Sequence, residues 1–266
     1  MSTPYLTRIA IYPIKSLDGM TLERTPMLNS GALGHDREFA LLDEQGRFVN
    51  GKRNAKVHQL RTSISTDYKT LSIQIQGSEQ RTTFQIDDER PDLEAWFSDY
   101  FGFAVKLAQN TVMGFPDDTH SPGPTIISTA TLETVASWFP GLSPDDIRLR
   151  LRTNLEIDGV PPFWEDRLFA QPHQQVQFQI GEVLFEGINP CQRCVVPTRD
   201  AKSGEGYPNF QKIFVAQRKA LLPDWATSTR FNHFYRLAIN TRLPGSQTGR
   251  TLSVGDEVTI QQTVEG

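Results

Sequence analysis

Cysteine is scarce in this chain. Among 266 residues there are only two, Cys191 and Cys194. Two cysteines cannot build the disulfide framework of a small secreted protein, so we expect a cytoplasmic chain whose thiols stay mostly reduced. A structural zinc site takes about four ligands, and the five histidines are scattered rather than paired. The composition therefore gives no support to a zinc site.

Long hydrophobic runs are missing as well. No apolar stretch approaches the ~20 residues that cross a bilayer. Residues 1–8 also lack the apolar core of a signal peptide. We therefore expect no membrane span and no membrane partner.

An excess of positive charge is also absent, because 27 lysines and arginines face 31 aspartates and glutamates. The net charge of −4 argues against a general nucleic-acid binder, although it allows a local basic pocket. The chain contains no GxxxxGK, GxGxxG or GxSxG motif. Ordinary nucleotide-binding and serine-hydrolase mechanisms therefore have no support.

Short strand-like segments fill most of the chain. Alternating or β-branched runs predict strands at 6–12, 21–28, 38–42, 58–65, 71–75, 82–86, 176–180, 183–187, 195–198, 237–240 and 257–262. Helical periodicity predicts helices at 91–101, 131–139 and 210–222, and 143–146 is typical of a helix cap with proline at the first helical position. We expect a mainly β fold with some helices (α+β), whose β-rich N-terminal unit and β-barrel C-terminal unit are joined near residues 120–145.

The two cysteines lie in the segment Pro-Cys-Gln-Arg-Cys-Val-Val-Pro-Thr, residues 190–198. A thioredoxin-like pair would open a helix, which lowers the thiol pKa, but 195–198 is predicted to be a strand. Two inert buried cysteines are the simplest alternative. Arg193 argues against it, because a guanidinium between two thiols stabilises a thiolate or binds an anion. Thiolate suits soft transition metals, so the pair could anchor a metal carried by an anionic cofactor.

Three other segments present cations or hydrogen-bond donors beside strands. Lys15 and Ser16 follow the strand that ends at Pro13, and Arg37 stands at the entrance of another. Arginines also alternate at 148, 150 and 152, which predicts three like charges on one face of an extended segment. Each segment alone is equally well explained by solvated surface charge or a weak surface ion pair.

Taken in order, these motifs resemble the MOSC family. They are Tyr-Pro-Ile-Lys-Ser at 12–16, His-Asp-Arg at 35–37, Arg-Thr-Asn at 152–154 and Pro-Cys-Gln-Arg-Cys at 190–194. The family includes the C-terminal domain of molybdenum cofactor sulfurase, the YcbX-like proteins and the mitochondrial amidoxime reducing component. The resemblance implies a MOSC N-terminal β-barrel domain at 1–120 and a MOSC β-barrel domain at 121–266, with a cofactor site between them.

The same resemblance implies a molybdenum cofactor, that is, molybdopterin carrying the metal. It implies that Cys194 is the metal ligand and the catalytic residue, whereas the role of Cys191 stays open. It further implies that the anionic cofactor is bound by Lys15, Ser16, Arg37, Arg152, Asn154, Gln192 and Arg193.

The activity implied by the resemblance is reduction of the N–O bond in N-hydroxylated compounds. Electrons would come from a separate ferredoxin-like, flavin or haem protein, because no cysteines remain here for an iron–sulfur cluster. One alternative is a non-enzymatic carrier of the cofactor, or of sulfur as a persulfide on either cysteine. Another is a structural β-domain with inert cysteines. The sequence leaves open the physiological substrate, the electron donor, any terminal sulfido ligand on molybdenum and the oligomeric state.

Overall fold

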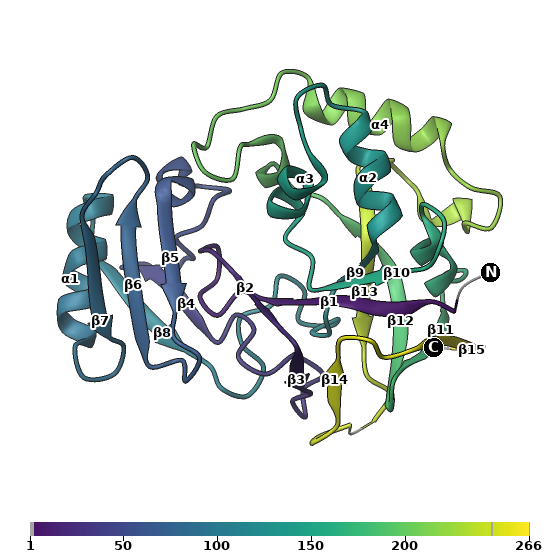
Figure 1. Cartoon of the computed structure of the whole chain (residues 1–266), viewed down its shortest axis with the longest axis horizontal. Coiled ribbons are helices and arrows are strands. Elements are labelled where there is room, and N and C mark those ends of the chain that lie inside the picture. Colours follow the sequence, from purple (N-terminus) through teal and green to yellow (C-terminus); the bar gives the residue numbers. More distant parts are fainter. Residues whose placement is uncertain (1–2, 246, 266) are drawn as a thin grey trace.

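A large sheet organises most of the protein. The computed structural model describes residues 3–245 and 247–265 (Figure 1). Its eight-stranded sheet has the order β15–β11–β12–β13–β9–β10–β1–β2. The strands, in that order, are Val258–Glu265, Gln174–Ile180, Val183–Gln192, Arg236–Arg242, Ile126–Ser128, Leu155–Asp158, Tyr5–Ile11 and Met20–Leu22. The β9–β10 pair is parallel, and the other ladders of this sheet are antiparallel.

The predicted fold class, mainly β with helices, is confirmed, but the large sheet is not a closed barrel. One edge of β1 pairs with β10. On its other edge, β2 pairs with residues 9–11, so only the start of β1 remains for β15. There the start of the chain meets the turn before β15 through a bridge between Tyr5 and Glu257. Three backbone hydrogen bonds accompany it, from the Leu6 N–H to the Asp256 carbonyl (2.8 Å), from the Gly255 N–H to the Leu6 carbonyl (2.7 Å) and from the Val258 N–H to the Pro4 carbonyl (2.8 Å). This contact is too short to form a ladder that closes the sheet into a barrel.

The N-terminal part also builds a smaller unit, seen at the left of Figure 1. It contains two sheets, β4–β8 and β5–β6–β7, and a helix α1 that packs on β7 and β8. The bounds are β4 Phe39–Asp43, β5 Leu60–Ile64, β6 Thr70–Ile75, β7 Arg81–Gln85, α1 Arg90–Phe101 and β8 Val105–Gln109. The unit has its own apolar core, in which Leu93 and Phe97 of α1 are fully buried.

Of residues 5–33, only Ile14 and Leu17 belong to that small core. Ile9 and Met27 pack with Phe178 and Ile239 of the large sheet. Strand β3 (Arg24–Pro26) pairs with β14 (Thr251–Ser253), close to the other end of the chain. The chain therefore starts in the large unit, builds the small one and returns. The predicted division at residue 120 stays a prediction.

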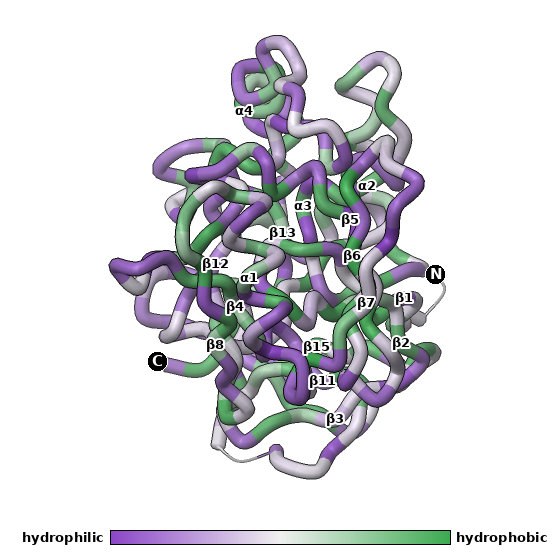
Figure 2. The backbone as a smooth tube through the Cα atoms, turned by 90° about the vertical axis from the view of Figure 1, so that its left-hand side faces the viewer, coloured by the Kyte–Doolittle hydropathy of each residue, from purple (hydrophilic) through white to green (hydrophobic). Residues whose placement is uncertain are grey.

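Three helices gather above the large sheet in Figure 1: α2 (Thr129–Ser137), α3 (Pro144–Leu151) and α4 (Phe210–Ala220). They share a third core, in which the rings of Phe139 and Phe210 stack with centroids 4.2 Å apart. The tube in Figure 2 shows that hydrophobic residues run through strands such as β13, whereas much of the connecting chain is hydrophilic. The three helices predicted from periodicity are confirmed. No helix of the described residues has the length and apolarity that a bilayer crossing requires.

The predicted extended segment with three arginines on one face is wrong. It is α3, which Ser143 caps through a capping box with Asp146. Side chains two positions apart point in nearly opposite directions on a helix. Arg148 therefore turns away and donates to buried Glu156 at 2.6 Å. Arg152 ends the helix with left-handed backbone, φ 55°.

The predicted strand at 195–198 is also wrong. The chain forms a 3-10 helix, η3 (Val196–Thr198). Pro197 has no N–H to give to a strand ladder, and the Thr198 N–H instead donates to the Val195 carbonyl at 3.0 Å. Cys194 is therefore followed by a short helix, and the predicted strand no longer counts against a thioredoxin-like pair. Other 3-10 helices are η1 Ala55–Gln59, η2 Trp164–Leu168 and η4 Ser228–Arg230.

A buried charged cluster lies at η2. Asp166 pairs with Arg218, whose guanidinium lies over the rings of Phe163 (4.4 Å) and Phe231 (4.8 Å). Glu165 is 1% exposed, and its Oε1 has no hydrogen-bond partner among the described residues. Burial, followed by the neighbouring carboxylate of Asp166, raises the pKa of Glu165 to about 7.

This shift predicts a pH-dependent stability. The folded-state pKa of Glu165 lies above the ordinary value of 4.5, so the folded state binds more protons and loses stability as pH rises through about 7. Glu165→Gln should stabilise the protein, and its gain should grow by about 2 kcal/mol between pH 5 and pH 8. Urea unfolding of both proteins at the two pH values measures this. An equal gain at both would show that the carboxyl stays protonated or is well solvated.

Candidate functional site

A cavity of about 950 Å³ lies between the small unit and the large sheet. Its wall comes from five parts of the chain: the loops around β1, β4 and β5, residues 113–125, the end of α3 with residues 152–154, residues 189–202, and β13 with Arg236 and Asn240. All eight residues singled out from the sequence line it, namely Lys15, Ser16, Arg37, Arg152, Asn154, Gln192, Arg193 and Cys194. The structure therefore brings the four motifs together, while the role of each residue in cofactor binding stays a prediction.

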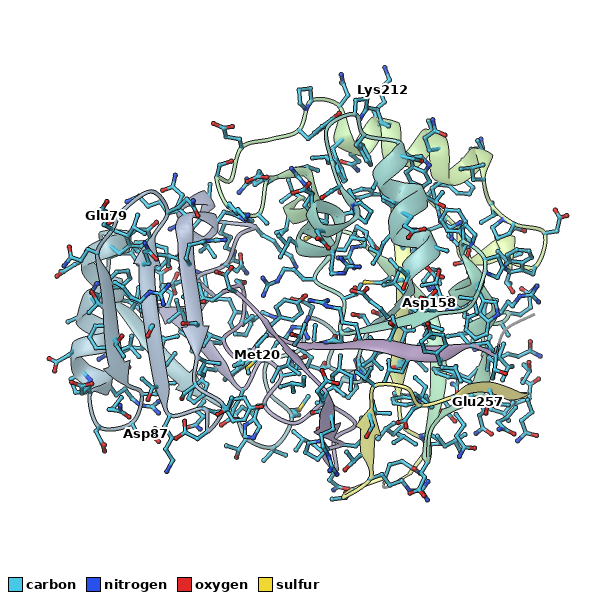
Figure 3. All side chains as sticks on the ribbon, in the orientation of Figure 1. Met20, Glu79, Asp87, Asp158, Lys212 and Glu257 are labelled. Atoms are coloured by element: carbon cyan, nitrogen blue, oxygen red, sulfur yellow. The ribbon has the colours of Figure 1, made fainter. Side chains whose placement is uncertain are left out.

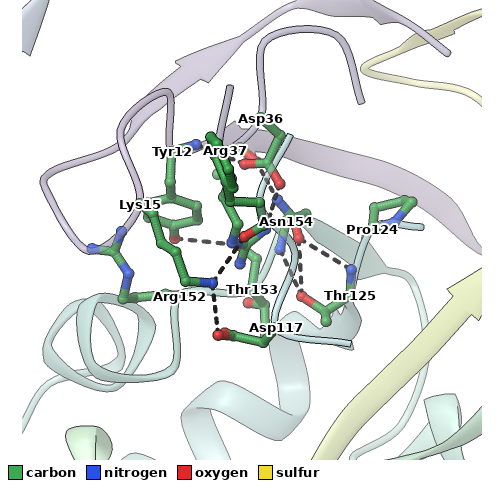
Figure 4. Close-up of polar contacts among 12 residues, drawn as sticks. Tyr12, Lys15, Asp36, Arg37, Asp117, Pro124, Thr125, Arg152, Thr153 and Asn154 are labelled. Carbon is green, nitrogen blue, oxygen red and sulfur yellow. Dashed lines mark hydrogen bonds and ion pairs between the residues drawn. The ribbon is translucent and has the colours of Figure 1, made fainter. Parts of the chain in front are cut away.

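The ring of Tyr12 organises one wall of the cavity. The guanidinium of Arg152 lies over this ring at 4.1 Å, and that of Arg37 lies 5.7 Å from its centroid (Figure 4). The Tyr12 hydroxyl donates to the Thr153 carbonyl at 3.3 Å. A Cβ on Gly19 would stand 2.6 Å from the ring, so glycine is required there. The ring thus contacts the guanidinium groups of both Arg152 and Arg37, and its π-face is attractive to each of these two like charges.

Backbone strain concentrates at the same wall. Ser16, Arg37 and Arg152 all have left-handed backbone, with φ of 73°, 51° and 55°. Non-glycine residues seldom adopt this conformation, and it persists where the surroundings fix it, commonly at functional sites. Gly114 helps to fix the turn at Arg37, because a Cβ there would lie 2.9 Å from the Arg37 carbonyl oxygen.

Lys15 is held beneath the loop at 113–124. Its ammonium donates to Asp117 Oδ1 and to the Phe115 carbonyl, both at 2.8 Å, and its side chain is 7% exposed. Burial lowers the pKa of Lys15, and Asp117 opposes this shift. For Asp117, burial works in the raising direction, but the charges of Lys15 and Arg37 hold its pKa far below the usual range. Asp117 is therefore an ionised internal counter-ion.

Asn154 is used within the protein. Its Nδ2 donates to the Ala10 carbonyl at 3.1 Å, and its Oδ1 accepts from the N–H and hydroxyl of Thr125 at 3.1 and 3.2 Å (Figure 4). These bonds tie β1 to the segment before β9. The geometry supports a positioning role, holding the wall on which Arg152 stands.

The two cysteines have different surroundings. Cys191 lies within β12, and its sulfur accepts from Arg193 Nη1 at 3.4 Å. Cys194 lies beyond the strand, and its sulfur accepts from the Val196 N–H at 3.5 Å. Both side chains are partly exposed and line the cavity. Arg193 also donates to the Leu151 carbonyl, and its buried Nε has no partner among the described residues.

Cations dominate the wall. Ten lysines and arginines line the cavity against four aspartates, a surplus of six positive charges. The cations are Lys15, Arg37, Lys52, Arg61, Arg150, Arg152, Arg193, Arg199, Lys202 and Arg236. The whole chain carries −4, so the residues outside this wall carry a net −10. No cluster of three or more histidine, cysteine or acidic side chains is placed to bind a metal in the described residues. Such a wall suits a metal that arrives with its own anionic ligand rather than a bare divalent cation.

Comparison with known proteins now decides the family. Residues 3–104 match the MOSC N-terminal beta barrel domain, and residues 125–259 match the MOSC domain. The chain belongs to the MOSC family. The predicted resemblance is therefore confirmed, on sequence matches that leave the roles of single residues untested.

Relatives of this MOSC protein are molybdenum cofactor sulfurases. It is 26% identical over 235 residues to the molybdenum cofactor sulfurase of Drosophila mojavensis, covering 77% of this chain and 29% of the relative. It is 21% identical over 256 residues to the Homo sapiens protein of the same name, covering 78% and 28%. The chain thus spans less than a third of these relatives. Together with the domain matches, they support a function related to the molybdenum cofactor.

Several cavity residues of the MOSC protein escaped the sequence analysis. Tyr12 stands in the first motif but was assigned only to a strand, and Asp117 lies in the predicted linker. Arg61 and Arg199 belong to segments without a motif. Tyr235 does not line the cavity but lies near Cys194 and Arg193. Its hydroxyl has no partner in the described residues, and burial raises its pKa to about 12. Except for Tyr12, no local pattern marks these residues, because only the fold brings them together.

The counter-ion role of Asp117 is testable. Asp117→Asn removes the carboxylate that competes with an incoming anion for Lys15, so inorganic phosphate should bind about threefold to tenfold more tightly. Titration calorimetry on the two proteins measures the difference. Asp118→Asn is the matched control, since Asp118 lies in the same loop and its carboxylate accepts from the His120 N–H instead. Equal effects of both substitutions would contradict the assignment.

Proposed function

We propose that this MOSC protein binds the molybdenum cofactor and reduces N-hydroxylated substrates with electrons from a separate redox protein. The observation that carries the proposal is the convergence of Cys194, Lys15, Arg37 and Arg152 on one cationic cavity. A phosphate-bearing cofactor needs cations and donors from several loops. A soft metal needs a thiolate.

The fit of such a cofactor is supported by unused donors. Arg150 and Arg193 both line the cavity, and each has a buried Nε without a partner among the described residues. A buried donor left unpaired costs free energy. An anionic ligand that accepts from these groups would remove that cost, whereas an apolar ligand would not.

Each residue then has a defined task. When bound, the cofactor supplies two-electron and oxygen-atom chemistry. Cys194 binds the metal, Lys15, Ser16 and Arg37 hold the anionic end, and Gln192 and Arg193 line the approach to the metal. Tyr12 and Asn154 keep Arg152 in place. Reduction of an N–OH group to N–H and water consumes an electron pair and protons, and the electron pair comes from a ferredoxin-like, flavin or haem donor.

A second candidate function is a carrier that delivers the cofactor, or sulfur as a persulfide, to another enzyme. It is favoured by the name sulfurase of the relatives. The guanidinium of Arg193 at 3.4 Å from the Cys191 sulfur also suits a negatively charged persulfide. Mass spectrometry of the native protein would then find one extra sulfur atom on a cysteine, and no N-hydroxylated compound would be reduced.

The test of the enzyme begins with metal content. We expect the protein purified from cells that make the cofactor to contain molybdenum and release pterin in stoichiometric amounts. Cys194→Ser should lose the metal, whereas Cys191→Ser, the matched control three positions away, should retain most of it. The loaded protein should reduce benzamidoxime when reduced methyl viologen supplies electrons. Wild-type protein free of metal and pterin would overturn the proposal.

A further inference from the structure

Three cations of the cavity wall lie where the small unit meets the loop after the cysteines. Arg61 stands on β5, and Arg199 and Lys202 stand on the loop at 199–206. Arg61 Nη2 donates across the junction to the Ala201 carbonyl at 3.1 Å, next to Lys202. Arg199 Nη1 donates in the other direction, to the Gly51 carbonyl at 2.8 Å. These two bonds hold the three cations on one part of the wall.

Backbone carbonyls fix these cations but leave much of their charge unpaired. Among residues 3–245 and 247–265, the buried Nε of Arg61 has no hydrogen-bond partner, and the guanidinium has one carboxylate contact, Asp18, 3.4 Å from Nη1. In the part of the chain that the structure describes, Arg199 makes no other side-chain hydrogen bond, and the ammonium of Lys202 makes none. Arginine forks that are held but not neutralised are suited to phosphate or carboxylate.

A buried histidine lies among them. His58 is 9% exposed, lines the cavity and has an Nε2 without a hydrogen-bond partner in residues 3–245 and 247–265. Burial lowers its pKa, and the charges of Arg199, Arg152 and Arg61 act in the same direction. His58 is therefore neutral near pH 7 and adds a polar group without a charge.

The cofactor assigned above does not use these cations. Its predicted residues Lys15, Arg37 and Arg152 stand at the wall of Tyr12, with Asp36 and Asp117 as their carboxylate neighbours. A phosphate monoester carries about −2 at most, whereas the cavity has a surplus of six positive charges. The residues outside the cavity wall carry a net −10, and Figure 3 shows two acidic residues, Glu79 and Asp87, at the edge of the small unit. The field therefore draws a further anion into the cavity.

We propose that Arg61, Arg199 and Lys202 form a second anion subsite, which binds the phosphate or carboxylate group of the substrate. The proposal rests on the function above and narrows its substrate class. The substrate is an N-hydroxylated compound with an anionic tail, whose N–OH group faces Cys194 while its tail is held at the subsite.

The experiment compares matched substrates on the cofactor-loaded protein. One pair is benzamidoxime and 4-carboxybenzamidoxime, and the other is N4-hydroxycytidine and its 5′-monophosphate. We expect the charged member of at least one pair to have the lower KM, and the pair that shows the larger difference identifies carboxylate or phosphate. The advantage should shrink as sodium chloride is added, because salt screens the attraction.

Variants assign the preference to the subsite. Arg199→Gln combined with Lys202→Ala should raise the KM of the charged member about tenfold and leave that of the neutral member within about twofold. Lys212→Ala, on α4 at the top of Figure 3 and not among the residues that line the cavity, is the control for a lost lysine. A parallel loss for both members would show a structural defect and overturn the proposal.

Titration calorimetry with the same compounds distinguishes a failure of the anion subsite from a failure of the proposed reductase function. Preferential binding of the charged members without turnover supports the subsite and counts against the proposed function. Turnover without any preference for charge overturns the subsite and leaves the function standing.

Discussion

The cavity depends on arginine side chains that are held by backbone carbonyls rather than by carboxylates. Arg152 donates to the carbonyl of Leu17, Arg193 to that of Leu151 and Arg199 to that of Gly51. A carbonyl fixes the direction of a guanidinium but leaves its net charge intact. Cations can therefore be packed around one cavity of an acidic protein and still present their charge to a ligand.

This arrangement also explains why the small unit stays against the large sheet. The carbonyls of Leu17 and Gly51 belong to the loops that precede and build the small unit, whereas Arg152 and Arg199 belong to the large one. Each such bond orders two chain segments and one charged side chain at once. The left-handed backbone at Arg152 ends α3 and turns the side chain toward Tyr12. In this orientation the guanidinium can reach the Leu17 carbonyl. The strained backbone thus orients the charged side chains, and the surrounding fold holds that backbone in its strained conformation.

The sequence predicted local structure well where one signal was strong. The alternation at 176–180 lies in the half-buried strand β11, and the apolar stripe on 91–101 lies in α1, which ends at Gly102 with φ 81°. It failed where two signals competed. At 148–152 the alternation of three arginines indicated an extended segment, although capping residues stand just before it. The cap favours a helix because it satisfies backbone N–H groups. A period of two over five residues is too short to determine the secondary structure. The predicted barrel is not closed, because the start of β1 meets the turn before β15 in an isolated bridge, and no local pattern shows how far two segments so distant in sequence will pair.

The candidate site divides in the same way. Residues inside contiguous motifs, such as Lys15 and Cys194, were found because type and spacing carry chemical meaning. Asp117 lies outside the motifs, and Asp36 stands in the His-Asp-Arg motif at 35–37 but was given no role in the predicted site. These two carboxylates differ in a manner that only the three-dimensional structure reveals. Asp36 is buried and accepts from the Tyr12 N–H at 2.8 Å, so it is a fixed part of the wall. Asp117 is 65% exposed and bonds to Lys15 from a loop that contains several prolines and glycines. An anion that enters the cavity therefore meets two different carboxylates. Asp36 is fixed in the wall, whereas Asp117 can be solvated by water. The ease with which Asp117 separates from Lys15 determines how readily Lys15 can bind the anion.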